Sequence, residues 1–145
     1  MHIGDLCTRD VQVASRDTPL IRLVLDMHRR HVGSVVVIER EGLVHRPIGI
    51  VTDRDVMRGE VTRKSDLFSM CAADVMSTDP LIFVESMEIS DAIAALRRRG
   101  VRRAPVIDEV GHLRGIITID DLLPAVAQEL KGIADLIGGQ AKKEN

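Results

Sequence analysis

The alternation of apolar and polar positions along the 145-residue chain predicts the order strand, helix, strand, strand, helix, and this order occurs twice. In the first half, residues 11–14 alternate with a period of two, which favours a short strand. Residues 20–27 carry apolar side chains at helical spacing, and Asp17-Thr18-Pro19 before them predicts a capping side chain followed by proline at the first helical position. The β-branched run 35–38 predicts a strand buried on both faces. Residues 48–51 predict the returning strand.

The second half repeats this order with small differences. Ser86 is expected to cap the helix that ends in the arginines of residues 97–99. Pro105 lies in the middle strand, and proline there predicts an edge or an end of a sheet. After the last strand, Pro124 is expected to end a short turn and to open a final helix, with a frayed tail from Gln140 onward.

A sequence repeat underlies this symmetry. The segment Gly49-Ile50-Val51-Thr52-Asp53-Arg54-Asp55 returns 66 positions later as Gly115-Ile116-Ile117-Thr118-Ile119-Asp120-Asp121, whereas upstream matches lie 69 positions apart. The first copy therefore carries three extra residues, between Val37 and Gly49. Repeats of this size predict two half-domains that bury their apolar faces on each other and leave a cleft with two related sites. We expect the following division: repeat 1 over 1–60, a connector over 61–72, repeat 2 over 73–131, and a helix end and tail over 132–145.

Composition narrows the functional classes. The net charge of −2 gives no basic field for nucleic acid, and two aromatic residues offer no base-stacking platform. A hydrophobic content of 45% is too high for disorder, and no apolar run approaches the roughly 18 residues of a membrane span. We therefore expect neither nucleic-acid binding nor membrane insertion. The start of the chain lacks signal-peptide features, and Cys7 and Cys71 occupy non-equivalent repeat positions, so reduced thiols and a cytoplasmic location are expected.

The duplicated Gly-apolar-apolar-Thr-x-x-Asp motif, with residues 101–108 before its second copy, resembles a tandem cystathionine-β-synthase (CBS) domain pair, or Bateman module. The resemblance spans about residues 3–130. It implies an α+β fold of two pseudo-symmetric repeats, each a small three-stranded sheet with two helices, packed sheet to sheet. It also implies frequent pairing into a disc-shaped homodimer. The ligands that it implies are adenosyl compounds in the cleft, namely AMP, ADP, ATP or S-adenosylmethionine, with no catalytic cofactor.

The resemblance also assigns roles to residues. Asp55 and Asp121 are expected to accept hydrogen bonds from ribose hydroxyls, and Thr52 and Thr118 to contact the ribose or phosphate side. A carboxylate suits this role because it can accept from two adjacent hydroxyls. The adenine is expected to be framed by residues that lead into the first strand of each repeat: Thr8, Val11, Val13, Thr78, Pro80 and Ile82.

The two repeats differ at the expected phosphate positions. Repeat 2 has Arg102 and Arg103 where repeat 1 has glycine and serine, so the tighter site is expected around Asp121. Arg54 and His31 are the candidates to compensate in repeat 1. The Arg97–Arg99 run is interpreted as a solvated helix end.

Two interpretations of the motif remain open. Thr-x-x-Asp is close to a capping box, in which threonine and acid satisfy each other's backbone amides. In the first interpretation the motif also binds a ligand, and the chain is a module that senses adenine nucleotides and acts through an effector protein or its own dimer. In the second interpretation the sites are degenerate and bind no ligand, and the chain is a dimerising adaptor.

Neither catalysis nor metal binding is expected from the sequence. His28 and His31 lie one helical turn apart, but the sequence marks no acidic or cysteine partner for a metal. No nucleophile–base constellation and no glycine-rich loop with a lysine are present. We therefore expect a protein that is not an enzyme. The chain is too short to include the catalytic or transport domain that such modules often accompany, so its effector is expected to be another polypeptide, or the chain to have been cut from one. The Met1 start favours a complete chain.

Overall fold

The structure, a computed structural model, describes residues 1–63 and 68–144 and has an α+β architecture with two three-stranded sheets. The strands of the first sheet are β1 (Val13–Ala14), β2 (Ser34–Glu41) and β3 (Val44–Thr52). Those of the second are β4 (Phe83–Val84), β5 (Arg103–Ile107) and β6 (Leu113–Thr118). In each sheet the middle strand pairs parallel with the short first strand and antiparallel with the third.

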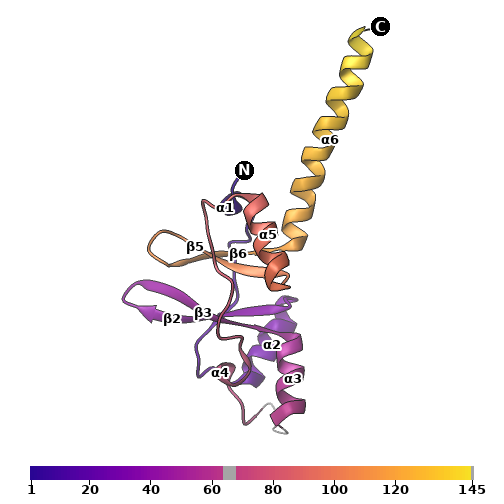
Figure 1. The fold of residues 1–145 in the computed structure, drawn as a ribbon. Helices are drawn as coiled ribbons and strands as arrows, with labels where there is room; N and C mark the ends of the chain where they lie inside the picture. Colours follow the sequence, from indigo (N-terminus) through magenta and orange to yellow (C-terminus); the bar gives the residue numbers. More distant parts are fainter. Residues whose placement is uncertain (64–67, 145) are drawn as a thin grey trace.

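Helices flank both sheets (Figure 1). The described helices are α1 (Ile3–Leu6), α2 (Leu20–Arg30), α3 (Asp53–Arg63), α4 (Ala72–Val75), α5 (Ile89–Arg99) and α6 (Ile119–Glu144). In Figure 1 the two halves lie one above the other, with both hairpins on one side and helices α2, α3, α5 and α6 on the other. Helix α6 extends far beyond the rest of the molecule.

The expected strand pairing and hairpin difference are confirmed. All four residues of the run 35–38 are buried in β2. Val37 lies opposite Gly49 in the first sheet, and Val106 opposite Gly115 in the second, so the three extra residues of repeat 1 fall in its longer hairpin. The first strand is shorter than expected, since only Val13 and Ala14 of the range 11–14 pair as a strand.

Each half is completed by the segment that leads into the other half. Ala72 of α4 lies in the core of the first half, together with Met70 and Met76. Ile3 of α1 lies in the core of the second half, next to Phe83. The leading segments thus cross over, which ties the two halves together through buried apolar contacts.

The predicted helix starts are wrong at both caps. Asp17 accepts a hydrogen bond from the Ser15 hydroxyl at 2.6 Å, and α2 begins at Leu20 with Pro19 as its N-cap residue. The Leu20 amide instead donates to the Met70 carbonyl at 2.9 Å, so a segment distant in sequence satisfies the helix end. Helix α5, the repeat 2 equivalent of α2, has Glu88 rather than Ser86 at its N-cap.

Two prolines lie where the sequence pattern did not predict them. Pro105 is buried in the central strand β5, not at an edge, and the parallel pairing with β4 starts one residue later, at Val106. Pro124 lies inside α6, which runs unbroken to Glu144 where a frayed tail was expected. Its missing amide removes only the helical bond to the Asp120 carbonyl. Part of the expected connector, residues 64–67, lies outside the described residues.

Candidate functional site

Both Thr-x-x-Asp corners form capping boxes at a strand-to-helix junction. At the end of β3, the Asp55 Oδ2 atom accepts hydrogen bonds from the Thr52 amide at 2.9 Å and from its hydroxyl at 3.0 Å. The Asp55 amide donates back to the Thr52 hydroxyl at 3.2 Å. Thr118 and Asp121 make the same three bonds at the end of β6, at 3.0, 3.2 and 3.3 Å.

The capping role leaves one oxygen of each carboxylate uncommitted. In both corners the bonds go to Oδ2, and within residues 1–63 and 68–144 no hydrogen bond to either Oδ1 is found. Both side chains are only half-buried. A capping box and a ligand contact are therefore compatible at these positions, and the surroundings decide which corner can hold a ligand.

A pocket of about 950 Å³ opens beside the first corner. It is built from both repeats: the β3–α3 corner of repeat 1, the segment leading to β4, and the end of α5 with the start of β5. Its lining residues are Ile50, Thr52, Asp53, Arg54, Asp55, Met57, Arg58, Ser77, Asp79, Pro80, Leu81, Arg99, Gly100, Val101, Arg102, Arg103 and Pro105.

The crossover of the leading segments explains this mixed lining. The Ser77 amide donates to the Ile50 carbonyl at 2.9 Å, which holds the segment leading to β4 beside β3. The approach needs glycine at position 49, since a Cβ atom there would lie 2.9 Å from the Ser77 carbonyl oxygen. The first corner therefore faces repeat 2 residues.

Positive charge is concentrated in this pocket. Five arginines line it, against three aspartates. Arg99 is engaged by the Asp79 carbonyl and carboxylate. For the other four, Arg54, Arg58, Arg102 and Arg103, no ion pair is found in the described part of the chain. Guanidinium groups without a carboxylate partner suit a phosphate-bearing ligand.

One backbone acceptor in the pocket also lacks its usual partner. In repeat 1, the Val36 amide donates to the Gln12 carbonyl at 2.9 Å. The equivalent residues in repeat 2 are Pro105, which has no amide, and Leu81. No backbone donor to the Leu81 carbonyl is found among the described residues. Leu81 and Pro105 both line the pocket.

The second corner has different surroundings. Arg30, the repeat 1 equivalent of Arg99, donates to the Gln12 side chain at 2.7 Å and to Asp10 at 2.8 Å, so its guanidinium is already paired. Thr8 is held by Ile116 through two backbone bonds of 2.9 Å. Repeat 1 supplies no arginine at positions 33 and 34. The groups contributed by repeat 1 thus largely satisfy one another.

Only some of the expected site residues line the pocket beside Asp55. The pocket brings together six of them: Thr52, Arg54, Asp55, Pro80, Arg102 and Arg103. It does not include the other eight: Thr8, Val11, Val13, His31, Thr78, Ile82, Thr118 and Asp121. The two arginines therefore line the pocket of Asp55, and they no longer give a reason to expect the tighter site at Asp121. A methyl group at Gly33 would lie 3.5 Å from an Arg103 guanidinium nitrogen and 3.4 Å from the Asp53 carboxylate, which shows how far Arg103 reaches toward repeat 1.

Sequence reasoning missed several lining residues, among them Arg58, Ser77, Asp79, Leu81 and Arg99. The segment leading to β4 was expected at the site, but through Thr78, Pro80 and Ile82, whereas Ser77, Asp79, Pro80 and Leu81 line the pocket. For Arg99, the available signal was its repeat equivalence to Arg30, which lies 69 positions earlier.

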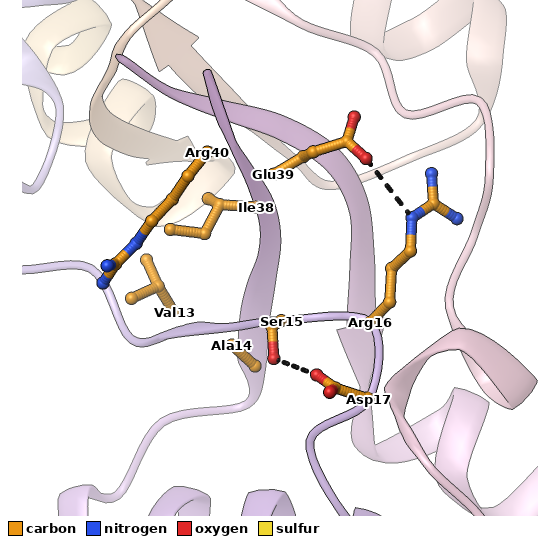
Figure 2. A pocket seen from close by; sticks show the side chains of 8 residues that line it. All are labelled: Val13, Ala14, Ser15, Arg16, Asp17, Ile38, Glu39 and Arg40. Atoms are coloured by element: carbon orange, nitrogen blue, oxygen red, sulfur yellow. Dashed lines mark hydrogen bonds and ion pairs between the residues drawn. The ribbon is translucent and has the colours of Figure 1, made fainter. Parts of the chain in front are cut away.

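A second pocket, of about 520 Å³, lies at the edge of the first sheet (Figure 2). In Figure 2, Arg16 reaches toward Glu39, with 3.8 Å between the Arg16 Nε and a carboxylate oxygen, and Ser15 contacts Asp17. The Ser15 hydrogen bond lowers the pKa of the Asp17 carboxyl. Two arginines and two acids balance the charge of this pocket, and of the expected site residues only Val13 lines it.

The described part of the chain offers little for metal binding or membrane insertion. Among the described residues, no group of three or more histidine, cysteine or acidic side chains is placed to hold a metal ion. No helix in that part of the chain is long and apolar enough to cross a membrane. Cys7 is packed against Gly115, and burial raises the pKa of its thiol.

Comparison with known proteins gives a consistent result. The family model for the CBS domain matches residues 3–61 and 72–128. An uncharacterized protein of Methanopyrus kandleri is 31% identical over 123 residues, which cover 85% of this chain and 61% of that protein. The chain thus spans less than two thirds of this relative's length.

Two solved structures share the fold and contain ligands. CBSX2 in complex with AMP has a TM-score of 0.75 at 23% identity, covering 88% of this chain and 97% of that one. A CBS domain pair in complex with 5′-methylthioadenosine and S-adenosyl-L-methionine has a TM-score of 0.74 at 13% identity, covering 87% and 99%. At these identities the likeness concerns the fold.

Proposed function

The chain belongs to the CBS-domain family, and from this membership and its pocket we propose that it is a regulatory module that binds an adenine nucleotide beside Asp55. An effector protein or another copy of the chain would recognise the nucleotide-bound state. The observation that carries the proposal is that, among residues 1–63 and 68–144, one Asp55 oxygen accepts no hydrogen bond and four arginines of the same pocket have no carboxylate partner. Adenosine compounds bound by two relatives of the same fold support it.

Each part of a nucleotide has a matching group in this pocket. The Asp55 Oδ1 would accept from the ribose hydroxyls, in bonds that contribute about 1.5–3 kcal/mol when water is excluded. Arg102 and Arg103 of repeat 2 would bind the phosphates together with Arg54 and Arg58 of repeat 1. Because S-adenosylmethionine carries a positive sulfonium and no phosphate, this arrangement favours AMP, ADP or ATP over it.

The adenine would be read by the Leu81 carbonyl. Within the described part of the chain this oxygen has no backbone donor, unlike its repeat 1 counterpart, and the amino group of adenine is a suitable replacement. Hypoxanthine has a carbonyl oxygen where adenine has this amino group. We therefore expect inosine triphosphate to bind about tenfold more weakly than ATP.

Replacing Pro105 by valine tests this assignment. The change copies Val36 of repeat 1, whose amide donates to the equivalent carbonyl. The new amide would compete for the Leu81 oxygen, so we expect ATP affinity to fall about threefold to tenfold. Titration calorimetry with ATP and inosine triphosphate is the measurement. A Pro105→Val protein that keeps the full preference for ATP would show that Leu81 does not read the base.

The proposed function itself is tested by calorimetry with AMP, ADP, ATP and S-adenosylmethionine on the unmodified protein. We expect binding in the micromolar to millimolar range, about −8 to −4 kcal/mol, with affinity increasing with the number of phosphates. The proposal fails if none of the four compounds gives heat at millimolar concentration. Tightest binding of S-adenosylmethionine would retain an adenosyl site but contradict the role given to the arginines.

Nucleotide binding would regulate the protein because residues of both repeats line the pocket. A nucleotide that contacts the β3–α3 corner of repeat 1 and the β5 start of repeat 2 would bind best when the two halves have one relative position. It would shift the protein toward that arrangement in proportion to its difference in affinity for the two. An effector that distinguishes the arrangements would then respond to nucleotide level.

A second candidate function is an adaptor that needs no ligand. The paired state of the repeat 1 equivalents of the pocket residues favours it for the second corner, since Arg30 is already bound by Asp10 and Gln12. The adaptor would have to assemble equally well with and without nucleotide. Partner binding that never changes on adding ATP would favour this function over sensing.

A further inference from the structure

Helix α6 extends away from the body of the molecule (Figure 1). Its apolar side chains there are exposed to solvent. Every residue from Ala127 to Gly138 is exposed. Five large apolar side chains of this helix are between 58% and 70% exposed: Leu123, Leu130, Ile133, Leu136 and Ile137. Such a contiguous apolar stripe on a soluble helix marks an interaction surface.

The spacing of the stripe is that of a coiled-coil seam. Leu123, Val126, Leu130, Ile133 and Ile137 follow one another at alternating steps of three and four residues. This alternation is the a/d pattern of a seven-residue repeat, which packs knobs into holes against a second helix of the same pattern. Ala127 and Ala134 flank the seam seven residues apart, and their small side chains allow close approach.

We propose that α6 is a self-association surface, in which copies of this chain pack their Leu123–Ile137 seams against one another. The complement of a seven-residue repeat is another helix with that repeat, and each further copy supplies one. This inference does not depend on nucleotide binding, since α6 beyond Leu123 contributes nothing to the Asp55 pocket.

Charge argues against a lipid surface as the occupant. An amphipathic helix that lies on anionic membrane has a polar face rich in lysine and arginine. Here the ionisable residues between Ala127 and Gly138 are Glu129, Lys131 and Asp135. Lys131 is paired with Asp135 at 3.7 Å, so the polar face presents no free basic group in this stretch.

The size and composition of the seam indicate how many copies meet. Fifteen residues make a stripe roughly 22 Å long, and one pair of such stripes buries well under the about 800 Å² per partner of a standard interface. A bundle in which each helix contacts two neighbours buries about twice as much. Leucine at Leu123 and Leu130 with the β-branched Val126 and Ile133 is also the a/d composition that favours more than two helices.

Light scattering coupled to gel filtration tests the proposal. We expect the full chain to have the mass of at least three copies of 16.0 kDa. The double variant Leu130→Glu/Ile133→Glu should have the mass of two copies or one, because charges at seam positions oppose packing. Both side chains are exposed, so the body should keep its fold, which circular dichroism and denaturant unfolding verify.

A matched control is Leu43→Glu, which places the same charge on a side chain that is 94% exposed at a hairpin tip. It should leave the mass unchanged. A wild-type mass of one or two copies at tens of micromolar would overturn the proposal, as would an unchanged mass in the double variant. Co-sedimentation of a monomeric wild-type protein with anionic vesicles, lost in the double variant, would overturn it in favour of a lipid surface.

Discussion

Replacing Asp55 by alanine is expected to weaken ATP binding by roughly tenfold to a hundredfold, while replacing Asp121 by alanine leaves it nearly unchanged. The first variant loses a charged acceptor for the ribose hydroxyls, a loss of about 1.5–3 kcal/mol, where each 1.4 kcal/mol is a factor of ten. The second loses a carboxylate for which Arg30, the repeat 1 equivalent of a pocket arginine, is already paired with Asp10 and Gln12. Titration calorimetry of both variants is the measurement.

The pair of variants separates ligand binding from capping. Asp55 and Asp121 make the same three hydrogen bonds with their threonines, so both substitutions remove the same cap and should cost about 1 kcal/mol of stability each. Equal loss of stability with unequal loss of affinity is therefore the expected signature. A larger loss of affinity in the Asp121 variant would instead support the sequence-based expectation of a tighter site there.

The second large effect is expected from alanine at either motif glycine. A Cβ atom at Gly115 would lie 2.7 Å from the Thr8 carbonyl oxygen and 2.7 Å from the Cys7 sulfur. At Gly49 it would lie 2.7 Å from the Met76 sulfur and 2.9 Å from the Ser77 carbonyl oxygen. Because a backbone oxygen cannot rotate away, each substitution should destabilise by the upper part of the roughly 1–3 kcal/mol typical of overpacking.

The two glycine variants should differ in ligand binding. Gly49→Ala displaces the segment of Ser77, which lines the pocket, so ATP affinity should fall along with stability. Gly115→Ala displaces the segment of Thr8, which does not line it. Denaturant unfolding and calorimetry measure the two effects. Gly132→Ala is the control, since a Cβ there meets nothing within 4 Å. A full-stability Gly115→Ala protein would contradict the crossover packing.

Much of the fold could be predicted from the sequence because its signals are local. The β-branched run 35–38 is buried as expected, and the three extra residues of repeat 1 lie in its hairpin. Gly100, directly after the last arginine of α5, has φ 65°, the left-handed conformation in which glycine commonly ends a helix. The duplicated motif lies at strand-to-helix corners, where its threonines and aspartates form caps.

The grouping of residues around the pocket could not be predicted in the same way. A sequence repeat shows which residues are equivalent, such as Asp55 and Asp121, but not which copy contacts which. The crossover of the leading segments contributes to this grouping, because it places Pro80 in the pocket of Asp55, which Arg102 from the start of β5 also lines. The errors at Pro105 and Pro19 have a similar origin, since both depend on partners distant in sequence.

The most direct test of the proposed site is a crystal structure of the full chain grown with ATP. We predict electron density for one nucleotide per chain in the pocket of about 950 Å³, with its ribose hydroxyls within hydrogen-bond distance of the Asp55 carboxylate and its phosphates between Arg54 and Arg102. An empty pocket at saturating ATP, or a nucleotide bound at the Asp121 corner alone, would contradict the account.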